Sequence, residues 1–304
     1  MVSVLDAMPV QTAAETPVKA ATAIHIADVS VTYPIGKKNT KTILDGLELE
    51  IAEGEFVVVL GQTGCGKSTL LRMILGQERP SAGAVLIGAN KVERVSAACG
   101  YVPQKYSLFP DRTVLGNLAF GPETAGYHIV ARWKPGFAAF KRKVRDEAMR
   151  QLERMGLHAS DAAKYPHQLS GGMQQRVAIA QALMMKPKIL LMDEAFSALD
   201  PSTRTSLQRM LRDIWLETRP TIVFVTHNTA EALYLATRVI VLARTGSDQA
   251  SGAKVALDLK LAGDGMSLKK NGQEFLDLVD RIESCSKGSD DVDLSSAIAK
   301  EDDL

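Results

Sequence analysis

The sequence has few cysteines, few aromatic residues and almost no net charge. Three cysteines (Cys65, Cys99 and Cys285) among 304 residues are too few and too scattered for a disulfide framework or a zinc site, which favours a reducing compartment. Aromatic residues make up 5%, which argues against a function based on stacked bases or sugars. A formal charge of +1 excludes polyanion binding through bulk charge alone.

Long apolar segments are also missing. No stretch reaches the roughly 20 apolar residues of a membrane span. Residues 1–22 lack the basic start and apolar core of a secretory signal, and we expect a flexible arm there. The remaining composition, 46% hydrophobic and 23% charged, is that of a globular protein with one large domain or two small ones. We expect a cytoplasmic protein that serves a membrane only through a partner.

Short runs of apolar, mostly β-branched residues recur along the chain. Such runs are typical of strands buried on both faces of a parallel sheet. They lie at residues 56–60, 189–192 and 222–225, with a weaker one at 239–242. Two earlier stretches, 24–33 and 43–51, instead alternate between apolar and polar residues, which predicts half-buried strands.

Helical periodicity lies between the predicted strands, at residues 70–75, 148–155 and 207–214. The last of these helices opens with Asp200 as N-cap and Pro201 at its first position. Strands that alternate with helices predict an α/β fold with a mainly parallel core sheet. We expect an antiparallel β subdomain at its start and a helical subdomain at about residues 105–185.

Three further segments differ from this core in composition. Residues 125–145 interleave basic with aromatic residues, which suits a solvated loop, a partner contact or acidic lipid head groups. Residues 246–285 are expected to form a short C-terminal extension whose amphipathic segment, 274–282, packs on the core. Residues 286–304 form an acidic tail that is expected to be disordered.

Residues 61–68 match the phosphate-loop pattern G-x-x-x-x-G-K-[ST] in full, between a predicted buried strand and a predicted helix. Glycines in such a loop let successive backbone N–H groups face phosphate oxygens at the positive end of the helix. Lys67 is expected to reach the β- and γ-phosphates, and Ser68 to bind Mg²⁺. The predicted ATP-binding residues here are Gly61, Gln62, Thr63, Gly64, Cys65, Gly66, Lys67, Ser68 and Thr69.

The apolar run at 189–192 ends in two carboxylates, Asp193 and Glu194. A phosphate-loop ATPase needs an acidic residue at the carboxyl end of a strand to hold the Mg²⁺ shell, and Asp193 suits this role. Glu194 would face the γ-phosphate and polarise the attacking water. Alone, the pair could equally face solvent at the end of a strand, but beside a phosphate loop the catalytic interpretation is favoured.

A second candidate anion site begins at Ser170, which Gly171 and Gly172 follow at the predicted start of a helix. A hydroxyl and open backbone N–H groups at a helix N-terminus can bind an anion. A lone S-G-G can equally be a simple helix cap. Beside a phosphate loop, it hints that two copies of the chain share nucleotides.

The order of these motifs resembles the nucleotide-binding subunits of ATP-binding-cassette (ABC) transporters from about Ile24 to Arg244. The most specific element is the signature L-S-G-G-M-Q at residues 169–174. The resemblance implies that Tyr33 stacks on adenine and that Gln104 touches Mg²⁺ and faces a membrane partner. It implies that His227 contacts the γ-phosphate and that residues 197–200 contact a second copy.

The resemblance also completes the expected site and its surroundings. It implies catalytic roles for Glu194, His227, Gln104 and Lys67. It implies Mg²⁺ ligands from Ser68, Gln104 and Asp193. Further ATP contacts would come from Ser170, Gly171, Gly172, Gln174 and Asp200. Residues 23–245 would form the ABC ATPase domain.

The architecture of the family implies a head-to-tail dimer with ATP and Mg²⁺ at its interface. Each ATP would lie between Lys67 and Ser68 of one subunit and Ser170 and Gly172 of the other. Closure on ATP and opening after hydrolysis would drive transmembrane permease subunits between two access states. The chain would then act peripherally, at the cytoplasmic face of a bacterial inner membrane.

The chain further resembles importers of nitrate, sulfonates and taurine, which work with a periplasmic or extracellular solute-binding protein. This resemblance rests on residues 166–168, on the predicted helix 231–236 and on the single cassette. In two places the chain departs from that branch. Residues 125–145 are longer than usual, and Asn228 stands where many relatives carry Asp.

Two other functions share this ATP chemistry. An ABC ATPase of a non-transport or lipid-related membrane complex remains open from the sequence alone. A soluble ABC ATPase acting on DNA or ribosomes is less favoured, because residues 68–170 leave no room for the coiled coil of DNA-repair relatives and only one cassette is present. No nucleic-acid partner is therefore expected. The solute itself is not encoded here, because the binding protein and permease select it in this family.

Overall fold

The computed structural model describes residues 21–36, 39–105, 107–126, 136–244, 251–261 and 272–287. The expected N-terminal arm lies outside the described residues up to position 20, and the expected acidic tail lies outside them from position 288 onward. Among the described helices, none combines the length and the apolar composition that crossing a bilayer requires.

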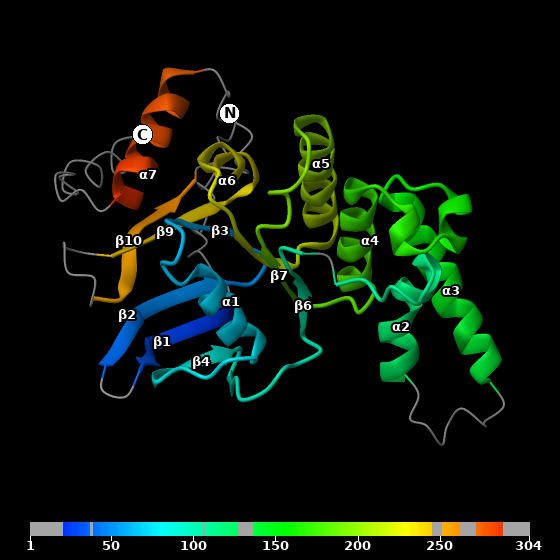
Figure 1. Ribbon diagram of the computed structural model, residues 1–304, viewed down its shortest axis with the longest axis horizontal. Helices are drawn as coiled ribbons and strands as arrows, with labels where there is room; N and C mark the ends of the chain where they lie inside the picture. Colours follow the sequence, from blue (N-terminus) through cyan, green and yellow to red (C-terminus); the bar gives the residue numbers. More distant parts are fainter. Residues whose placement is uncertain are drawn as a thin grey trace, which may run out of the picture.

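The described strands form a single mixed sheet in the order β5-β4-β1-β2-β10-β9-β3-β8-β7-β6 (Figure 1). Strands β9, β3, β8, β7 and β6 run parallel, whereas β5, β4, β1 and β2 pair antiparallel. The predicted α/β fold, with a mainly parallel core and an antiparallel β subdomain, is confirmed. The strands are β1 (Thr22–Ile35), β2 (Asn39–Ala52), β3 (Phe56–Gly61), β4 (Ala82–Ile87), β5 (Asn90–Lys91), β6 (Cys99–Val102), β7 (Ile189–Asp193), β8 (Thr221–Val225), β9 (Arg238–Arg244) and β10 (Ala253–Lys260).

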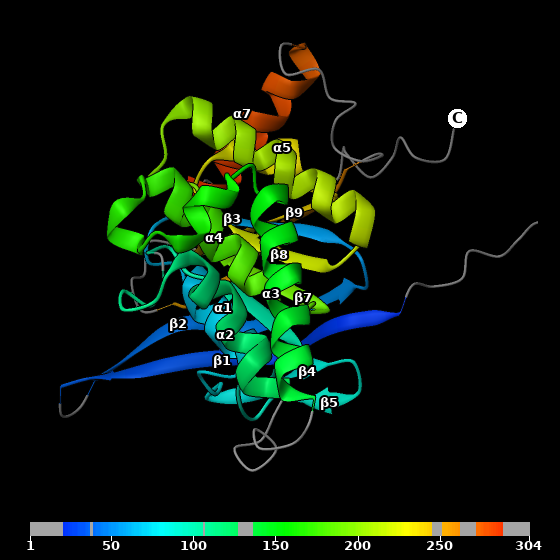
Figure 2. The same ribbon diagram turned by 90° about the vertical axis from the view of Figure 1, so that its right-hand side faces the viewer.

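Helices α2, α3 and α4 gather at one end of the molecule, and Figure 2 looks onto them from that end. The helices are α1 (Lys67–Leu75), α2 (Val114–Gly126), α3 (Phe137–Arg154), α4 (Gly171–Leu183), α5 (Pro201–Thr218), α6 (Thr229–Leu235) and α7 (Gln273–Lys287), with 3-10 turns at Ala159–Ala163 and Pro166–Gln168. α3 begins well before the predicted periodic segment, so the end of the basic stretch 125–145 is helical. Residues 127–135 of that stretch lie outside the described part.

The central strand β3 is buried along its whole length and separates two apolar clusters. Because successive strand residues point to opposite faces, Val57 and Val59 join the cluster that contains α1. Phe56 and Val58 face the other cluster, which holds the buried residues of α4, α5 and α6. This burial on both faces explains the unbroken apolar run that predicted the strand.

The parallel register brings the carboxyl ends of three strands to one edge of the sheet. Gly61 pairs with Leu242 of β9, and Val59 pairs with Val225 of β8. Asp193, the last residue of β7, also pairs with Val225. The phosphate loop, the two carboxylates after β7 and the loop after β8 therefore leave the sheet side by side, where ligands of open α/β sheets bind.

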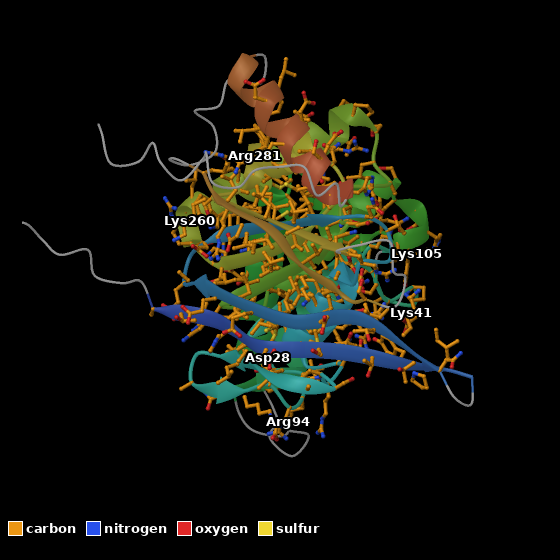
Figure 3. The ribbon with its side chains drawn as sticks, turned by 90° about the vertical axis from the view of Figure 1, so that its left-hand side faces the viewer. Asp28, Lys41, Arg94, Lys105, Lys260 and Arg281 are labelled. Atoms are coloured by element: carbon orange, nitrogen blue, oxygen red, sulfur yellow. The ribbon has the colours of Figure 1, made fainter. Side chains whose placement is uncertain are left out.

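Strand β10, which was not expected from the sequence, inserts between β2 and β9 and joins the two parts of the sheet. Its alternating Val255, Leu257 and Leu259 follow a stretch rich in Gly and Ser, which masked the signal. The amphipathic segment packs on the core as expected, since Phe275 and Ile282 of α7 are buried. Figure 3 looks onto the end of the molecule where β10 and α7 lie.

Candidate functional site

The phosphate loop connects β3 to α1 with glycine as the N-cap of the helix. Gly66 adopts a left-handed backbone (φ 97°), and a Cβ there would lie 2.7 Å from Cδ2 of Leu44. Because Gly66 has no side chain to cap α1, the first N–H groups of the helix remain for an anion. The local geometry therefore suits a phosphate group.

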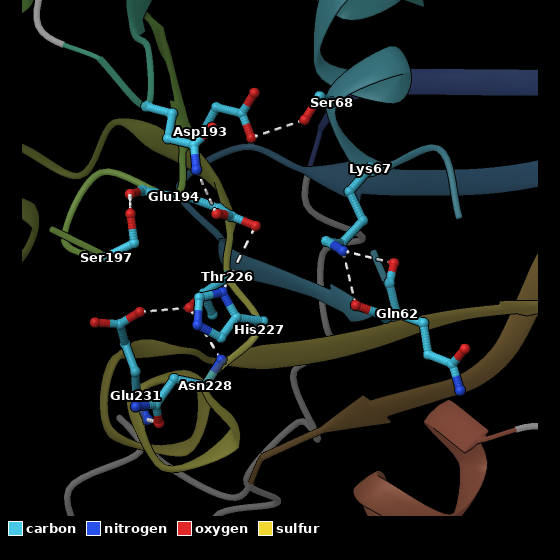
Figure 4. Close-up of polar contacts among 12 residues, drawn as sticks. Gln62, Lys67, Ser68, Asp193, Glu194, Ser197, Thr226, His227, Asn228 and Glu231 are labelled. Carbon is cyan, nitrogen blue, oxygen red and sulfur yellow. Dashed lines mark hydrogen bonds and ion pairs between the residues drawn. The ribbon is translucent and has the colours of Figure 1, made fainter. Parts of the chain in front are cut away.

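The ammonium of Lys67 lies within the loop. Its Nζ donates to the carbonyl oxygens of Gly61 at 2.7 Å and of Gln62 at 2.9 Å, and the residue is only 6% exposed (Figure 4). Beside it, burial raises the pKa of the Cys65 thiol, which disfavours the reactive thiolate near neutral pH. The loop thus holds the positive charge of Lys67 at the place where phosphates would bind.

Ser68 and Asp193 meet across the edge of the sheet. The Ser68 hydroxyl donates to Oδ1 of Asp193 at 3.0 Å (Figure 4). Burial raises the pKa of Asp193, the hydrogen bond from Ser68 opposes this shift, and the nearby charge of Glu194 adds to it. A carboxylate with this environment favours a positive partner.

Glu194 contacts two other residues that were expected to be catalytic, Gln104 and His227. Nε2 of Gln104 donates to its Oε2 at 2.8 Å, and Nδ1 of His227 lies 3.6 Å from its Oε1. The backbone of Glu194 is left-handed (φ 45°), and the Ser197 hydroxyl donates to its carbonyl oxygen at 2.9 Å (Figure 4). The structure therefore brings Gln104, Glu194 and His227 together beside the phosphate loop.

The signature residues lie apart from this cluster. Ser170 is the N-cap of α4 and accepts a hydrogen bond from the N–H of Met173 at 3.3 Å, directly before Gly171 and Gly172. The side chain of Gln174 donates to the carbonyl oxygen of Leu169 at 3.2 Å. Within the described ranges, no hydrogen bond or ion pair joins residues 169–174 to the phosphate loop.

Tyr33 and Asp200 also have partners outside the phosphate loop. The Tyr33 hydroxyl donates to the carboxylate of Glu78, and the tyrosine is 38% exposed on β1. Asp200 caps α5 by accepting the N–H groups of Ser202 at 3.2 Å and Thr203 at 3.0 Å, as predicted. The hydrogen bond from the Ser202 hydroxyl, together with the smaller effect of these backbone bonds, holds the pKa of Asp200 well below its usual range.

Two arginines near the site were missed by the sequence analysis. Arg244, at the end of β9, donates to the carbonyl oxygen of Gly64 at 3.1 Å. Arg204 of α5 donates to the carbonyl oxygens of Phe196 at 3.2 Å and Leu199 at 2.9 Å. A basic residue at the carboxyl end of a strand beside β3 was the available signal for Arg244. Arg204 belongs to no motif and gave none.

A phosphate loop at the edge of a mainly parallel sheet, with Asp and Glu at the end of a neighbouring strand, defines a P-loop nucleoside triphosphatase. The family model of the ABC transporter matches residues 44–197. An uncharacterised ABC transporter ATP-binding protein of Methanocaldococcus jannaschii is 42% identical over 80% of this chain and 84% of its own. The chain therefore belongs to the ABC transporter family and is the ATP-hydrolysing subunit of a transporter.

Two import proteins are similar along almost their full length. The nitrate import ATP-binding protein NrtD of Synechocystis sp. is 38% identical, with 87% of this chain and 95% of NrtD covered. The taurine import ATP-binding protein TauB of Rhizobium johnstonii is 36% identical, with 88% and 98% covered.

Among solved structures, a dimeric ATP-binding cassette in a post-hydrolysis state, bound to ADP and Pi, superposes with a TM-score of 0.66. It is 31% identical over 79% of this chain and 99% of its own. Its fold agrees with the cassette fold of this chain.

Proposed function

We propose that the chain energises a bacterial ABC importer for a small oxyanion such as nitrate, a sulfonate or taurine. The near full-length similarity to NrtD and TauB carries this proposal. The described residues form one cassette, and β10 and α7 follow its strand β9. The proposal places the subunit at the cytoplasmic face of the membrane, below its permease.

Two copies of the chain would share each ATP. Lys67 would exchange its two loop carbonyls for the β- and γ-phosphates, while the open N–H groups of α1 bind phosphate oxygens. The exposed ring of Tyr33 would stack on adenine. The opposite side would come from Ser170 and Gly172 of the second copy, because in one chain the signature does not reach the phosphate loop.

The oxygen atoms beside the loop fit Mg²⁺. This ion prefers hard oxygen ligands and is usually held by one or two carboxylates together with substrate phosphates. The Ser68 hydroxyl and the Asp193 carboxylate already meet at 3.0 Å, and the side-chain oxygen of Gln104 remains when its nitrogen binds Glu194. Bound Mg²⁺ would neutralise phosphate charge. The described residues hold no cluster of three His, Cys, Asp or Glu side chains suited to a metal, so phosphate oxygens would complete the set.

Hydrolysis would depend on Glu194. Its carboxylate would accept a proton from the attacking water, and Gln104 and His227 would hold it in place. His227 is 63% exposed on its side chain, so its free edge could contact the γ-phosphate. Lys67 would stabilise charge that develops on the phosphate oxygens.

The proposal can be tested by finding the membrane partner. Glu194→Gln protein with ATP is used as bait on detergent-solubilised membranes of the host, and captured proteins are identified by mass spectrometry. A Lys67→Ala/Glu194→Gln protein is the matched control, because it should bind ATP about 10- to 100-fold more weakly. We expect the single variant to recover a polytopic membrane protein that is encoded beside a secreted solute-binding protein.

Capture of other proteins would indicate a different function. A membrane partner without a solute-binding protein would favour a non-transport or lipid-related complex. Ribosomal or DNA-bound proteins would overturn the transport function and leave the ATPase chemistry intact. Binding and uptake of nitrate, sulfonates and taurine by the recovered system would then identify the solute.

A further inference from the structure

A buried carboxylate lies below the loop that carries His227. Glu231, in the first turn of α6, is 5% exposed, and each of its two oxygens accepts one hydrogen bond; Figure 4 shows the bond to Thr226. The Thr226 hydroxyl donates to Oε2 at 2.6 Å, and Nε2 of Gln208 donates to Oε1 at 2.8 Å. Both donors are themselves buried, at 3% and 6% exposure.

The residues directly before and after His227 in the sequence both belong to this network. Thr226 precedes the histidine, and its hydroxyl oxygen accepts the N–H of Asn228, which follows it, at 3.1 Å. The side chain of Asn228 in turn accepts the N–H of Glu231 at 3.0 Å. Because the His227 side chain is 63% exposed, its place 3.6 Å from Glu194 depends on this backbone loop rather than on packing.

The same network reaches α5 through a polar stripe. Arg204, Gln208 and Arg212 recur every four residues and therefore share one side of the helix. Arg204 holds the carbonyls of the loop after Glu194, and Gln208 holds Glu231. Arg212 donates to the carbonyl oxygen of Tyr234, near the end of α6, at 3.2 Å. One helix thus holds both the loop that follows Glu194 and the loop that carries His227.

We propose that Glu231 is a positioning residue for ATP hydrolysis, which fixes His227 against Glu194 by joining Thr226 to Gln208 of α5. A carboxylate suits this place because both neighbours act as donors and neither carboxylate oxygen needs to donate. This inference rests on the proposed role of His227.

The test compares two buried threonines, Thr221 at the start of β8 and Thr226 directly after its end. Thr226→Val removes the hydroxyl that joins Glu231 to Asn228. Thr221→Val is the matched control, because Thr221 is also 3% exposed and its hydroxyl accepts the N–H of Gly54 at 3.0 Å, far from the site. The full chain is assayed for kcat and KM of ATP hydrolysis, with thermal unfolding as a check on folding.

We expect Thr226→Val to lower kcat by about 10- to 100-fold with little change in KM, since misplacing a group in the site costs this much. Thr221→Val should keep kcat within about twofold despite a similar loss of thermal stability. A double-mutant cycle adds His227→Ala. In the His227→Ala background, Thr226→Val should change kcat little further, because both substitutions remove the action of the same histidine. Equal kcat values for the two threonine variants, or additive losses in the cycle, would overturn the inference.

Two further variants keep the outcomes distinct. Glu231→Gln should retain most of kcat, because a rotated Gln208 amide can accept from the new amide while the remaining oxygen accepts from Thr226. Glu231→Ala should lower kcat as Thr226→Val does, and equal activity of the two Glu231 variants would contradict the inference. If His227→Ala alone leaves kcat unchanged, the proposed role of His227 fails instead.

Discussion

The phosphate loop and the signature loop both lead into the N-terminus of a helix, but their first turns are built differently. α1 begins behind Gly66 without a side-chain cap, whereas Ser170 caps α4 with its own hydroxyl. The phosphate loop is bonded to Asp193 through Ser68, and Glu194 lies next to it. Among the described residues, no hydrogen bond or ion pair joins the signature to a carboxylate. We propose that one chain supplies the phosphate-loop half of one ATP site and the signature half of another, which a second copy completes.

The motifs made this difference predictable from the sequence only in part. The G-x-x-x-x-G-K-S spacing and the apolar runs before Gly61 and Asp193 fixed one loop and its neighbours, because strand burial and register follow from such patterns. The separation of Ser170 from that loop depends on how α4 packs, which no local pattern encodes.

Long-range polar contacts were also beyond local patterns. Arg204, Gln208 and Glu231 gave no sequence signal, because their partners lie in other segments of the chain. The left-handed backbone of Glu194 had none either, since it is a non-glycine residue held by tertiary contacts. β10 had a signal of period two in Val255, Leu257 and Leu259, but the Gly- and Ser-rich stretch before it suggested an extension.

The largest expected effect separates binding from hydrolysis on the phosphate-loop side. Glu194→Gln removes the proton acceptor but keeps the shape of the side chain and its contact with Gln104. We expect phosphate release to fall by about 10²–10⁴-fold while ATP still binds. Single-turnover phosphate release and equilibrium nucleotide binding measure the two quantities. Glu217→Gln, at an exposed site that pairs with Arg154, is the control; hydrolysis at the parental rate in Glu194→Gln would refute the catalytic assignment.

A smaller effect on binding distinguishes the two loops directly. Lys67→Ala should weaken ATP binding by about 10- to 100-fold, because hydrogen bonds to charged groups contribute about 1.5–3 kcal/mol each. Ser170→Arg should leave binding to the isolated chain within about twofold, because a single signature loop does not touch its own phosphate loop. Both variants should lose turnover.

Mixing the two inactive variants tests whether the halves come from different chains. A mixed dimer has one site with the intact phosphate loop of the Ser170→Arg chain and the intact signature of the Lys67→Ala chain. Equal mixing should therefore restore part of the ATPase activity, in proportion to the mixed dimers formed. No recovery in a mixture that dimerises, as judged by gel filtration, would place both loops in one functional chain.

The smallest expected effect contrasts two carboxylates by pH. Burial raises the pKa of Asp193, so the folded chain holds that proton longer than the unfolded chain. Stability from this group is therefore lost as pH rises from the ordinary value of 3.8 through the raised pKa. Asp193→Asn avoids the loss, and without nucleotide it should unfold at a slightly higher temperature than the parent near neutral pH.

Asp200 should show the opposite sign. Its pKa is lowered by the cap of α5, so its contribution is present above the ordinary carboxyl value and disappears as pH falls toward the lowered pKa. Asp200→Asn should therefore unfold slightly below the parent at neutral pH and converge with it in acid. Thermal unfolding of both variants against pH, each compared with the parent, cancels the other titrating groups. If the two variants shift the unfolding temperature in the same direction near neutral pH, burial does not disfavour the charged form of Asp193, and the electrostatic contrast between Asp193 and Asp200 fails.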